Sequence, residues 1–285
     1  MGLKIFLDGK FVNKEDAKVS VFDHGLLYGD GVFEGIRAYN GKIFKLNEHI
    51  IRLYESAKTI MLHIHMTKEE MIAKTIETVK INNIKDGYVR LVITRGYGDL
   101  GLDPKKCKQA TIFIIADTIA LYPQKFYEEG LAVITVPTRR NTPEALNPRI
   151  KSLNYLNNIM AKIEASNAGA FEAIMLNQEG FVAECTGDNI FIIKNGVIIT
   201  PPTTAGGLEG VTRDTVMKLA ESTGFTVKEL LFTRHEIFNA DECFLTGTAA
   251  EIIPVVKVDS RVIGEGVPGT ITKKLMSGYK ELVYQ

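Results

Sequence analysis

The chain has 285 residues, 45% of them hydrophobic and 24% charged, and its 34 basic and 34 acidic side chains give a formal net charge of zero. At roughly 150 residues per domain, this length predicts two domains. The composition is typical of a soluble globular protein. The lack of a basic excess argues against a nucleic-acid partner, and no basic amphipathic segment or long apolar run predicts a membrane contact.

The three cysteines, Cys107, Cys185 and Cys243, are odd in number and far apart. Without a CxxC pair they predict neither a disulfide framework nor a zinc site, so no metal is expected. The N-terminal residues read as a strand and lack the apolar core of a signal peptide. A reducing, cytoplasmic location fits these features.

The first part of the chain mixes strands and helices. The dipeptide Asn40-Gly41 predicts a type I′ hairpin. Asn47 is the expected N-cap of a helix, and Thr67 with Glu70 predicts a capping box for the next helix. The predicted strands are 3–7, 32–39, 42–46, 88–94 and 110–116, and the first helix is expected over about 47–62.

A connection with mixed aromatic and charged residues follows, and the domain boundary is predicted there. The expected division is a smaller N-terminal α/β domain 1–118, an interdomain loop 119–130 and a larger C-terminal domain 131–285 that carries Lys151. In that domain strands are predicted at 131–136, 173–176, 181–185, 189–193, 197–200, 227–230 and 242–245, and helices at about 153–168, 212–223 and 270–282.

The predicted fold class is α/β of the α+β type, with two domains of hairpin-rich sheets flanked by helices. The elements do not alternate regularly as βαβ units, which disfavours a doubly wound sheet.

Two segments have the character of anion sites. The glycine turn 207–210 runs into an amphipathic helix, whose first N–H groups could bind an anion, although Thr212 could equally be an ordinary N-cap. The segment 245–250 ends a strand in small residues and hydroxyls, which could form a backbone nest or simply a tight polar turn.

Three further positions could carry chemistry. The Lys151 amine could attack a carbonyl, although most lysines are solvated surface groups. Glu184 lies among apolar strand residues, where a buried carboxylate would need a partner, but it could also face outward. Tyr88 and Arg90 share one face of a strand, which suits a carboxylate ligand or a solvated sheet face.

Together these segments resemble the branched-chain amino-acid aminotransferases, fold-type IV enzymes that use pyridoxal 5′-phosphate (PLP). The resemblance extends over nearly the whole chain, with six segments in the family's order. They are 28–37 (YGDGVFEGIR), 49–53 (HIIRL), 150–155 (IKSLNY), 184–191 (ECTGDNIF), 208–213 (LEGVTR) and 247–251 (GTAAE).

This resemblance implies roles for individual residues. Lys151 would be the catalytic residue, bonding the cofactor aldehyde and then moving the substrate proton. Glu184 would keep the pyridine nitrogen protonated, Tyr155 would bond the phenolic oxygen and Leu208 would pack against the ring. The phosphate would be held by Arg52, Val211, Thr212 and Thr248.

The family also implies the substrates. Tyr88 and the backbone at Thr248 and Ala249 would hold the α-carboxylate, and Arg90 would reach the distal carboxylate of glutamate. Tyr28, from the same chain or from a neighbouring subunit, would line an apolar pocket with Phe33 and Gly35, and Arg37 belongs to the same substrate set.

The implied reaction exchanges the amino group between Leu, Ile or Val and 2-oxoglutarate. A D-amino-acid or (R)-amine transaminase, an aminodeoxychorismate lyase and a catalytically idle binding protein of the same fold are the alternatives. The expected partners are small amino and 2-oxo acids, with a homodimer or an assembly of dimers as the oligomeric state.

Overall fold

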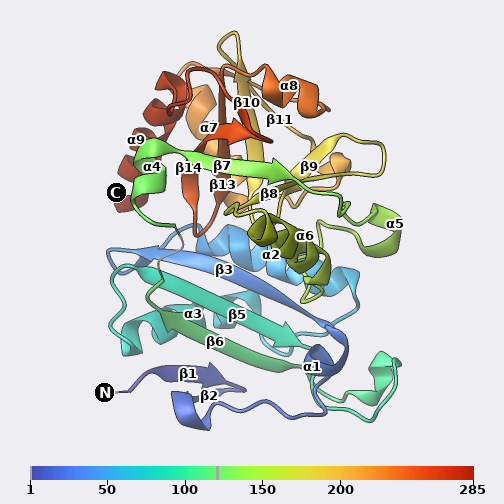
Figure 1. The fold of residues 1–285 in the computed structure, drawn as a ribbon. Coiled ribbons are helices and arrows are strands. Elements are labelled where there is room, and N and C mark those ends of the chain that lie inside the picture. The colour runs from blue at the N-terminus through green and yellow to red at the C-terminus, as the bar shows by residue number, and fades with distance from the viewer. Residues whose placement is uncertain (1, 120–121) are drawn as a thin grey trace. The chain divides into compact units, whose positions relative to one another are not determined.

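The computed structural model describes residues 2–119 and 122–285 and divides into two compact units (Figure 1). Unit 1 comprises Met1–Ile119 and Ile150–Asn154, and unit 2 comprises Ala120–Arg149 and Tyr155–Gln285. Position 1 of the predicted first domain and positions 120 and 121 of the predicted loop lie outside the described residues.

Unit 1 is built on a six-stranded sheet in the order β2-β1-β6-β5-β3-β4, and all of its strand pairs are antiparallel. Its strands are β1 Lys4–Leu7, β2 Lys10–Asn13, β3 Gly31–Tyr39, β4 Lys42–Ile43, β5 Gly87–Thr94 and β6 Thr111–Asp117. Asn40 and Gly41 join β3 to β4 with φ angles of 48° and 79°, which confirms the predicted hairpin turn.

The helices of unit 1 are α1 His24–Tyr28, α2 Leu46–Thr59 and α3 Lys68–Ile81, with short 3-10 turns η1 Lys14–Asp16 and η2 Pro104–Lys106. The capping box of Thr67 and Glu70 is confirmed. The expected N-cap Asn47 is wrong, because Lys45 takes a left-handed conformation with φ of 53° and the helix begins directly after it. The backbone turn between β4 and α2 therefore replaces a side-chain cap.

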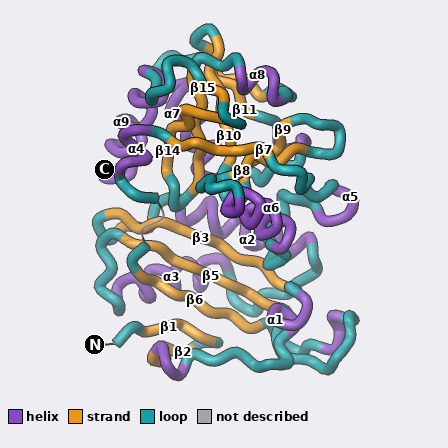
Figure 2. The backbone as a smooth tube through the Cα atoms, viewed as in Figure 1, coloured by secondary structure: helices purple, strands orange, loops and turns teal. Residues whose placement is uncertain are grey.

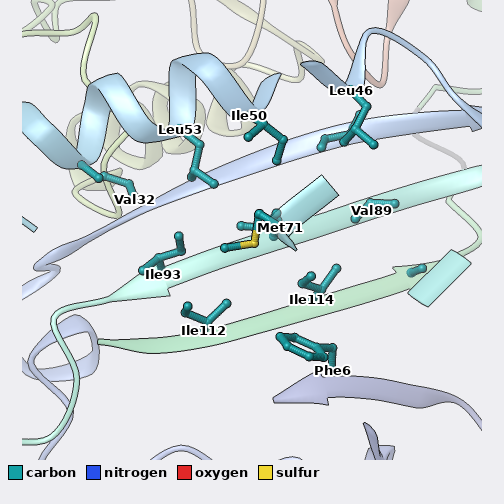
Figure 3. Packing of buried hydrophobic residues seen from close by; sticks show 14 of the residues in the cluster. Phe6, Val32, Leu46, Ile50, Leu53, Met71, Val89, Ile93, Ile112 and Ile114 are labelled. Atoms are coloured by element: carbon teal, nitrogen blue, oxygen red, sulfur yellow. The ribbon is translucent and has the colours of Figure 1, made fainter. Parts of the chain in front are cut away.

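The core of unit 1 lies between this sheet and helices α2 and α3. Leu46, Ile50 and Leu53 of α2 point toward the strands, and Met71 of α3 lies among strand side chains (Figure 3). Burying one such side chain stabilises the fold by roughly 1.5–3 kcal/mol. Strand β3 contributes Val32, Ile36 and Ala38 to this core, so its alternate residues lie on the opposite face of the sheet.

Unit 2 contains a nine-stranded mixed sheet in the order β12-β11-β10-β13-β14-β7-β8-β9, with β15 paired to β14. The pairs β11–β12, β14–β7 and β7–β8 are parallel. The strands are β7 Leu131–Thr135, β8 Ala173–Leu176, β9 Val182–Cys185, β10 Asn189–Lys194, β11 Val197–Thr200, β12 Thr226–Glu229, β13 Glu242–Gly247, β14 Glu251–Val258 and β15 Arg261–Val262.

The helices of unit 2 are α4 Lys125–Glu129, α5 Pro143–Leu146, α6 Leu156–Asn167, α7 Val211–Ser222, α8 Arg234–Phe238 and α9 Thr270–Tyr284, with a 3-10 turn η3 Thr203–Ala205. Figure 2 shows the strands of each unit gathered together with helices beside them. The predicted class of hairpin-rich sheets flanked by helices is confirmed. Within the described residues, no helix combines the length and the apolar character needed to cross a membrane.

Strand β14 lies inside the sheet although the sequence analysis does not predict it. Pro254, which lacks a backbone N–H, argues against a central strand. In the structure the proline pairs with Phe244 of β13, and pairing with β7 starts only at Val255. The proline therefore lies just outside the β14–β7 ladder, where its missing N–H would cost a hydrogen bond.

The segment that carries Lys151 belongs to unit 1, whereas the sequence analysis placed it in the larger C-terminal domain. The N–H of Phe33 donates to the carbonyl of Lys151 at 3.0 Å, and the N–H of Leu153 donates to the carbonyl of Gly31 at 2.9 Å. Residues 150–154 thus extend along β3 by backbone pairing, which side-chain patterns do not reveal.

Candidate active site

Lys151 is held at three points in unit 1. Its carbonyl accepts from the N–H of Phe33, and its own N–H donates to the Ser56 hydroxyl of α2 at 3.1 Å. Its Nζ lies 4.6 Å from the centre of the Phe33 ring. The backbone contacts fix the origin of the side chain, and the ring gives the amine an apolar neighbour on the sheet face opposite the core.

A second cluster joins β3 to α2 and centres on Glu34, which is 0% exposed. The Glu34 carboxylate accepts from His49 Nδ1 at 2.7 Å and from both Nε and Nη2 of Arg52 at 2.8 Å. Burial alone raises the pKa of Glu34, but the charge of Arg52, followed by that of His49 and the hydrogen bonds, lowers it to about 2. The carboxylate is therefore ionised and holds the Arg52 guanidinium in one orientation.

Glu34 and His49 were not among the predicted site residues. Both lie in the segments that carried the resemblance, and His49 precedes Arg52 by three residues, which places both on one helix face. That spacing was the feature of the sequence from which His49 could have been predicted as a neighbour of Arg52. Burial of His49 lowers its pKa, against the opposing effect of Glu34, so the Glu34–Arg52 pair is the charged core of this cluster.

The predicted substrate residues of β3 and β5 lie on one face of the sheet. Gly35 is opposite Arg90, and Arg37 is opposite Tyr88. The Arg90 guanidinium lies 4.7 Å from the centre of the Phe33 ring and 5.4 Å from that of Tyr88. A Cβ on residue 35 would lie 1.7 Å from the Tyr88 hydroxyl. Glycine at this position therefore leaves the space that the tyrosine occupies.

Tyr28 is not brought to this group by any contact among the described residues. Its hydroxyl accepts from the N–H of Gly101 at 3.0 Å, and its ring packs edge-on against His24 at 5.0 Å. The side chain is thus fixed to the loop after β5.

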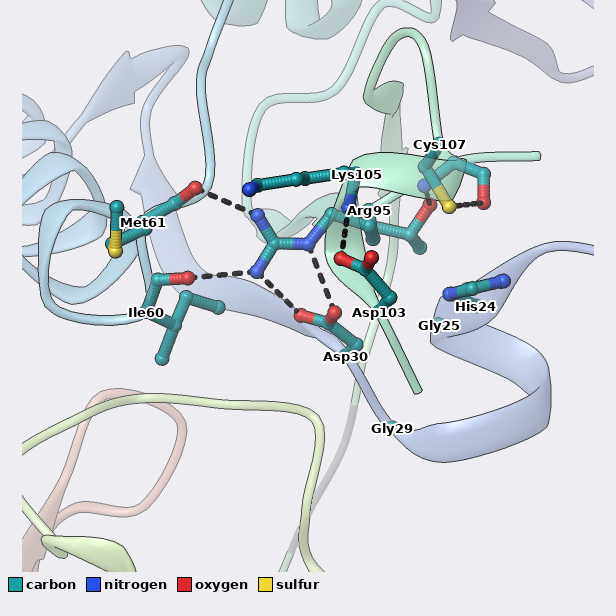
Figure 4. A network of polar contacts seen from close by, with 12 residues as sticks. His24, Gly25, Gly29, Asp30, Ile60, Met61, Arg95, Asp103, Lys105 and Cys107 are labelled. Atoms are coloured by element: carbon teal, nitrogen blue, oxygen red, sulfur yellow. Dashed lines mark hydrogen bonds and ion pairs between the residues drawn. The ribbon is translucent and has the colours of Figure 1, made fainter. Parts of the chain in front are cut away.

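Asp30, which precedes β3, is engaged by Arg95 through two hydrogen bonds of 2.9 Å (Figure 4). Arg95 also donates to the carbonyls of Ile60 and Met61, each at 2.7 Å. Arginine thereby caps the C-terminal end of α2, the helix that carries Arg52. The Asp30 charge is balanced within this network.

In unit 2, Glu184 of β9 is buried. Its carboxylate accepts from Arg140 Nε at 2.7 Å and from the N–H of Leu208 at 2.8 Å. Arg140 also donates to the Asn157 side chain at 2.9 Å. Glu184 therefore faces the protein interior, where Arg140 is its charged partner. Arg140 was missed, because nothing in the proline-containing loop 137–148 distinguishes it from Arg139.

Helix α7 starts without a side-chain cap. Gly210 is the N-cap residue and Thr212 is the second residue of the helix, which excludes the alternative that Thr212 is an ordinary N-cap. A Cβ on residue 210 would lie 2.1 Å from Asn189 Oδ1, and Asn189 binds the Leu208 carbonyl at 2.9 Å. Close packing thus requires glycine here, and among the described residues no side chain accepts from the first-turn N–H groups of Val211 and Thr212.

The segment 248–250 forms the turn between β13 and β14 and carries Thr248 and Ala249. Among the described residues, no hydrogen bond is made by the N–H of Thr248 or Ala249. Tyr155 immediately precedes α6 and belongs to unit 2. No group of His, Cys, Asp and Glu side chains suited to a metal ion is present in 2–119 or 122–285.

Comparison with known proteins shows the family of the chain. Residues 31–258 match the family model for class IV aminotransferases. A Methanocaldococcus jannaschii protein provisionally named a branched-chain-amino-acid aminotransferase is 57% identical over 98% of this chain and 96% of its own. A Bacillus licheniformis D-alanine aminotransferase is 38% identical over 99% and 97%.

Comparison with solved structures gives the same family. The Escherichia coli branched-chain aminotransferase superposes with a TM-score of 0.97 at 34% identity, covering 99% of this chain and 95% of that one. The branched-chain aminotransferase from Thermobaculum terrenum, solved in its PLP-bound form, gives 0.89 at 34% identity, covering 99% and 94%. The chain belongs to the class IV aminotransferase family, and its cofactor is PLP.

The donor set fits that cofactor. A primary amine lies on a fixed backbone at Lys151, and a buried carboxylate at Glu184 accepts a hydrogen bond from Arg140. In unit 1 the Arg52 guanidinium, and in unit 2 the uncapped start of α7, are each a kind of donor that suits a phosphate. Each group has a counterpart on PLP: the aldehyde, the ring nitrogen and the phosphate.

Proposed function

We propose that this enzyme transfers the amino group between the branched-chain L-amino acids Leu, Ile and Val and 2-oxoglutarate. The observation that carries the proposal is the sheet face of β3 and β5, where the Phe33 ring lies beside the Arg90 guanidinium at 4.7 Å. An apolar ring suits a branched side chain, and an arginine suits the distal carboxylate of glutamate. A branched-chain transaminase must accept both.

Within this proposal, PLP supplies an electron sink for the charge that develops at the substrate Cα. Lys151 would hold the cofactor through its amine, and the same amine would move a proton at the substrate Cα. Glu184, held by Arg140, keeps a proton on the ring nitrogen. Arg52, the N–H groups of Val211 and Thr212, and Thr248 hold the phosphate, while Tyr155 and Leu208 position the ring.

The substrate roles follow from the sheet and the turn. Tyr88 and the N–H groups of Thr248 and Ala249 bind the α-carboxylate. Arg90 binds a distal carboxylate, and Phe33 and Gly35 shape the side-chain pocket. Arg37 belongs to the same substrate set, and Tyr28 joins it from a neighbouring subunit. Discrimination among Leu, Ile and Val is small, since a methylene is worth only about 1–3 kcal/mol.

Single half-reactions test the proposal. Purified PLP-loaded enzyme, given L-leucine without an acceptor, should form 4-methyl-2-oxopentanoate in stoichiometric amount, and added 2-oxoglutarate should then become glutamate. D-Alanine should give little pyruvate under the same conditions. Pyruvate formed from D-alanine without product from L-leucine would overturn the assignment.

The second candidate is a D-amino-acid transaminase. It is favoured by one observation, the 38% identity to a D-alanine aminotransferase over nearly the full length of both chains. The same half-reactions separate the two, because the D-specific enzyme would respond to D-alanine.

Replacing Arg90 with alanine should raise the KM for glutamate and 2-oxoglutarate by about 30-fold, as expected for a carboxylate that loses its charged partner. The KM for L-leucine should change by less than about threefold, because the leucine side chain has no charge to pair. Steady-state kinetics with each substrate measure the split. Arg234→Ala, an exposed arginine in α8, is the control, and equal losses for both substrates would show that Arg90 does not select the distal carboxylate.

A homodimer, or an assembly of dimers, in the cytoplasm completes the proposal. Helix α6 exposes Leu156, Ile159, Met160 and Ile163, which follow helical spacing along one face. A second copy of the chain would cover such a stripe. All three cysteines are free, which suits a reducing compartment.

A further inference from the structure

Two buried carboxyl groups of unit 2, Glu172 and Asp188, have no part in the roles given above. Glu172 accepts from the N–H of Ala173 at 2.7 Å, from the N–H of Thr186 at 3.0 Å and from the Thr186 hydroxyl. Asp188 is 8% exposed, and among the described residues its carboxyl group accepts one hydrogen bond, from the Tyr122 hydroxyl at 3.1 Å. Within the described part of the chain, Glu172 therefore accepts three hydrogen bonds, whereas Asp188 accepts one.

Asp188 lies against the turn that carries Thr248 and Ala249. Asn189 pairs with Thr246 between β10 and β13, which brings the preceding residue opposite Gly247. A Cβ on residue 247 would lie 1.9 Å from Asp188 Oδ1. The carboxyl group thus rests directly on the Gly247 backbone, one residue before the N–H groups proposed to bind the substrate carboxylate.

The surroundings of Asp188 disfavour its charge. Burial, followed by the charge of Glu172, raises the pKa of Asp188 to about 7, against the opposing effects of the Tyr122 hydrogen bond and of Lys162 on α6. Glu184 of β9 acts in the same direction as Glu172. Burial also raises the pKa of Tyr122 and of Cys185, so both stay neutral. Burial and the two neighbouring carboxylates thus all oppose ionisation of Asp188.

We propose that Asp188 sets the affinity of the Thr248–Ala249 turn for the substrate α-carboxylate through its own protonation. When neutral, the carboxyl leaves the N–H groups of the turn free to attract an anion. When ionised, it places a like charge beside the bound carboxylate and weakens binding. This inference rests on the proposed function, because it requires the turn to hold the substrate carboxylate.

The test uses 4-methylpentanoate, which has the carbon skeleton of leucine without an amino or keto group. Its carboxylate is ionised throughout the range from pH 6 to 8.5, so its own charge does not change. The dissociation constant is measured on the PLP-loaded enzyme from the change in visible absorbance. Wild-type affinity should weaken by about tenfold more than that of Asp188→Asn between these pH values, a size reasonable for like charges several ångströms apart at a partly buried site.

Asp188→Asn retains an oxygen that accepts from Tyr122, so the fold is preserved while the charge is removed. Other titrations of the site occur in both proteins and cancel in the comparison. Asp241→Asn changes an exposed aspartate of the same unit and should titrate like the wild type. Glu172→Gln is a second, independent variant and should move the midpoint of the wild-type curve to lower pH, because the charge that opposes ionisation of Asp188 is gone.

Identical pH dependence in the wild type and Asp188→Asn overturns the inference, as does a Glu172→Gln midpoint that stays in place. If L-leucine still yields its 2-oxo acid in that case, the proposed function stands and only the role of Asp188 falls. If 4-methylpentanoate fails to bind and L-leucine fails to react, the proposed function falls first.

Discussion

Lys151→Ala is expected to lower the transamination rate by about 10³-fold or more, because it removes the amine that bonds the cofactor and transfers the substrate proton. The variant should also lack the visible absorbance band of a lysine-bound cofactor, whereas the wild type should show the band and lose it on borohydride reduction. Absorbance spectra and single-turnover product formation measure both effects.

The contacts of Lys151 make this variant informative. Its backbone is bonded to Phe33 and Ser56, and alanine keeps both hydrogen bonds, so the fold should be retained. Lys58→Ala, an exposed lysine on α2, is the matched control. A Lys151→Ala enzyme with the visible band and normal turnover would disprove the catalytic role.

Glu34→Gln is expected to destabilise unit 1 by about 3 kcal/mol, since it leaves the Arg52 charge in a buried cluster without its counter-charge. Urea denaturation of the cofactor-free protein measures the loss. Glu48→Gln on the same helix as Arg52 breaks an exposed pair with Lys45 and should cost less than about 1 kcal/mol. Equal losses in the two variants would show that the buried pair contributes no more than a surface pair.

The same pair gives a stability profile in acid. The pKa of Glu34 is lowered from 4.5 to about 2 in the folded protein. A lowered pKa means that the ionised group contributes stability that is fully present above about pH 4.5 and is lost as the pH falls toward 2. Glu34→Gln should therefore show a shallower loss of stability over that interval.

Local patterns predicted the elements that depend on neighbouring residues. The Asn40-Gly41 hairpin and the Thr67–Glu70 capping box lie where the sequence places them, because each is decided within a few residues. The interior strand β14 was not predicted. A proline such as Pro254 disfavours a central strand locally, and only the register of its two neighbours makes the proline acceptable here.

Contacts between residues far apart in the sequence also limit what could be predicted about the site. The resemblance pointed to Glu184 and Arg52, but their partners Arg140 and Glu34 are 44 and 18 residues away in sequence. Such pairs form through tertiary packing, which no periodicity records. The sequence left open whether Thr212 is an N-cap for a related reason, because Gly210 contacts Asn189, which lies 21 residues away in sequence.

The pairing of residues 150–154 with β3 has a consequence for synthesis of the protein. Unit 1 is discontinuous: it comprises Met1–Ile119 and a second stretch, Ile150–Asn154, that follows the opening residues of unit 2. On the ribosome, β3 therefore gains its edge partner only after a further 30 residues, Ala120–Arg149, have been made. A nascent chain that stops short of Lys151 lacks both the amine and the backbone segment that completes the strand beside it.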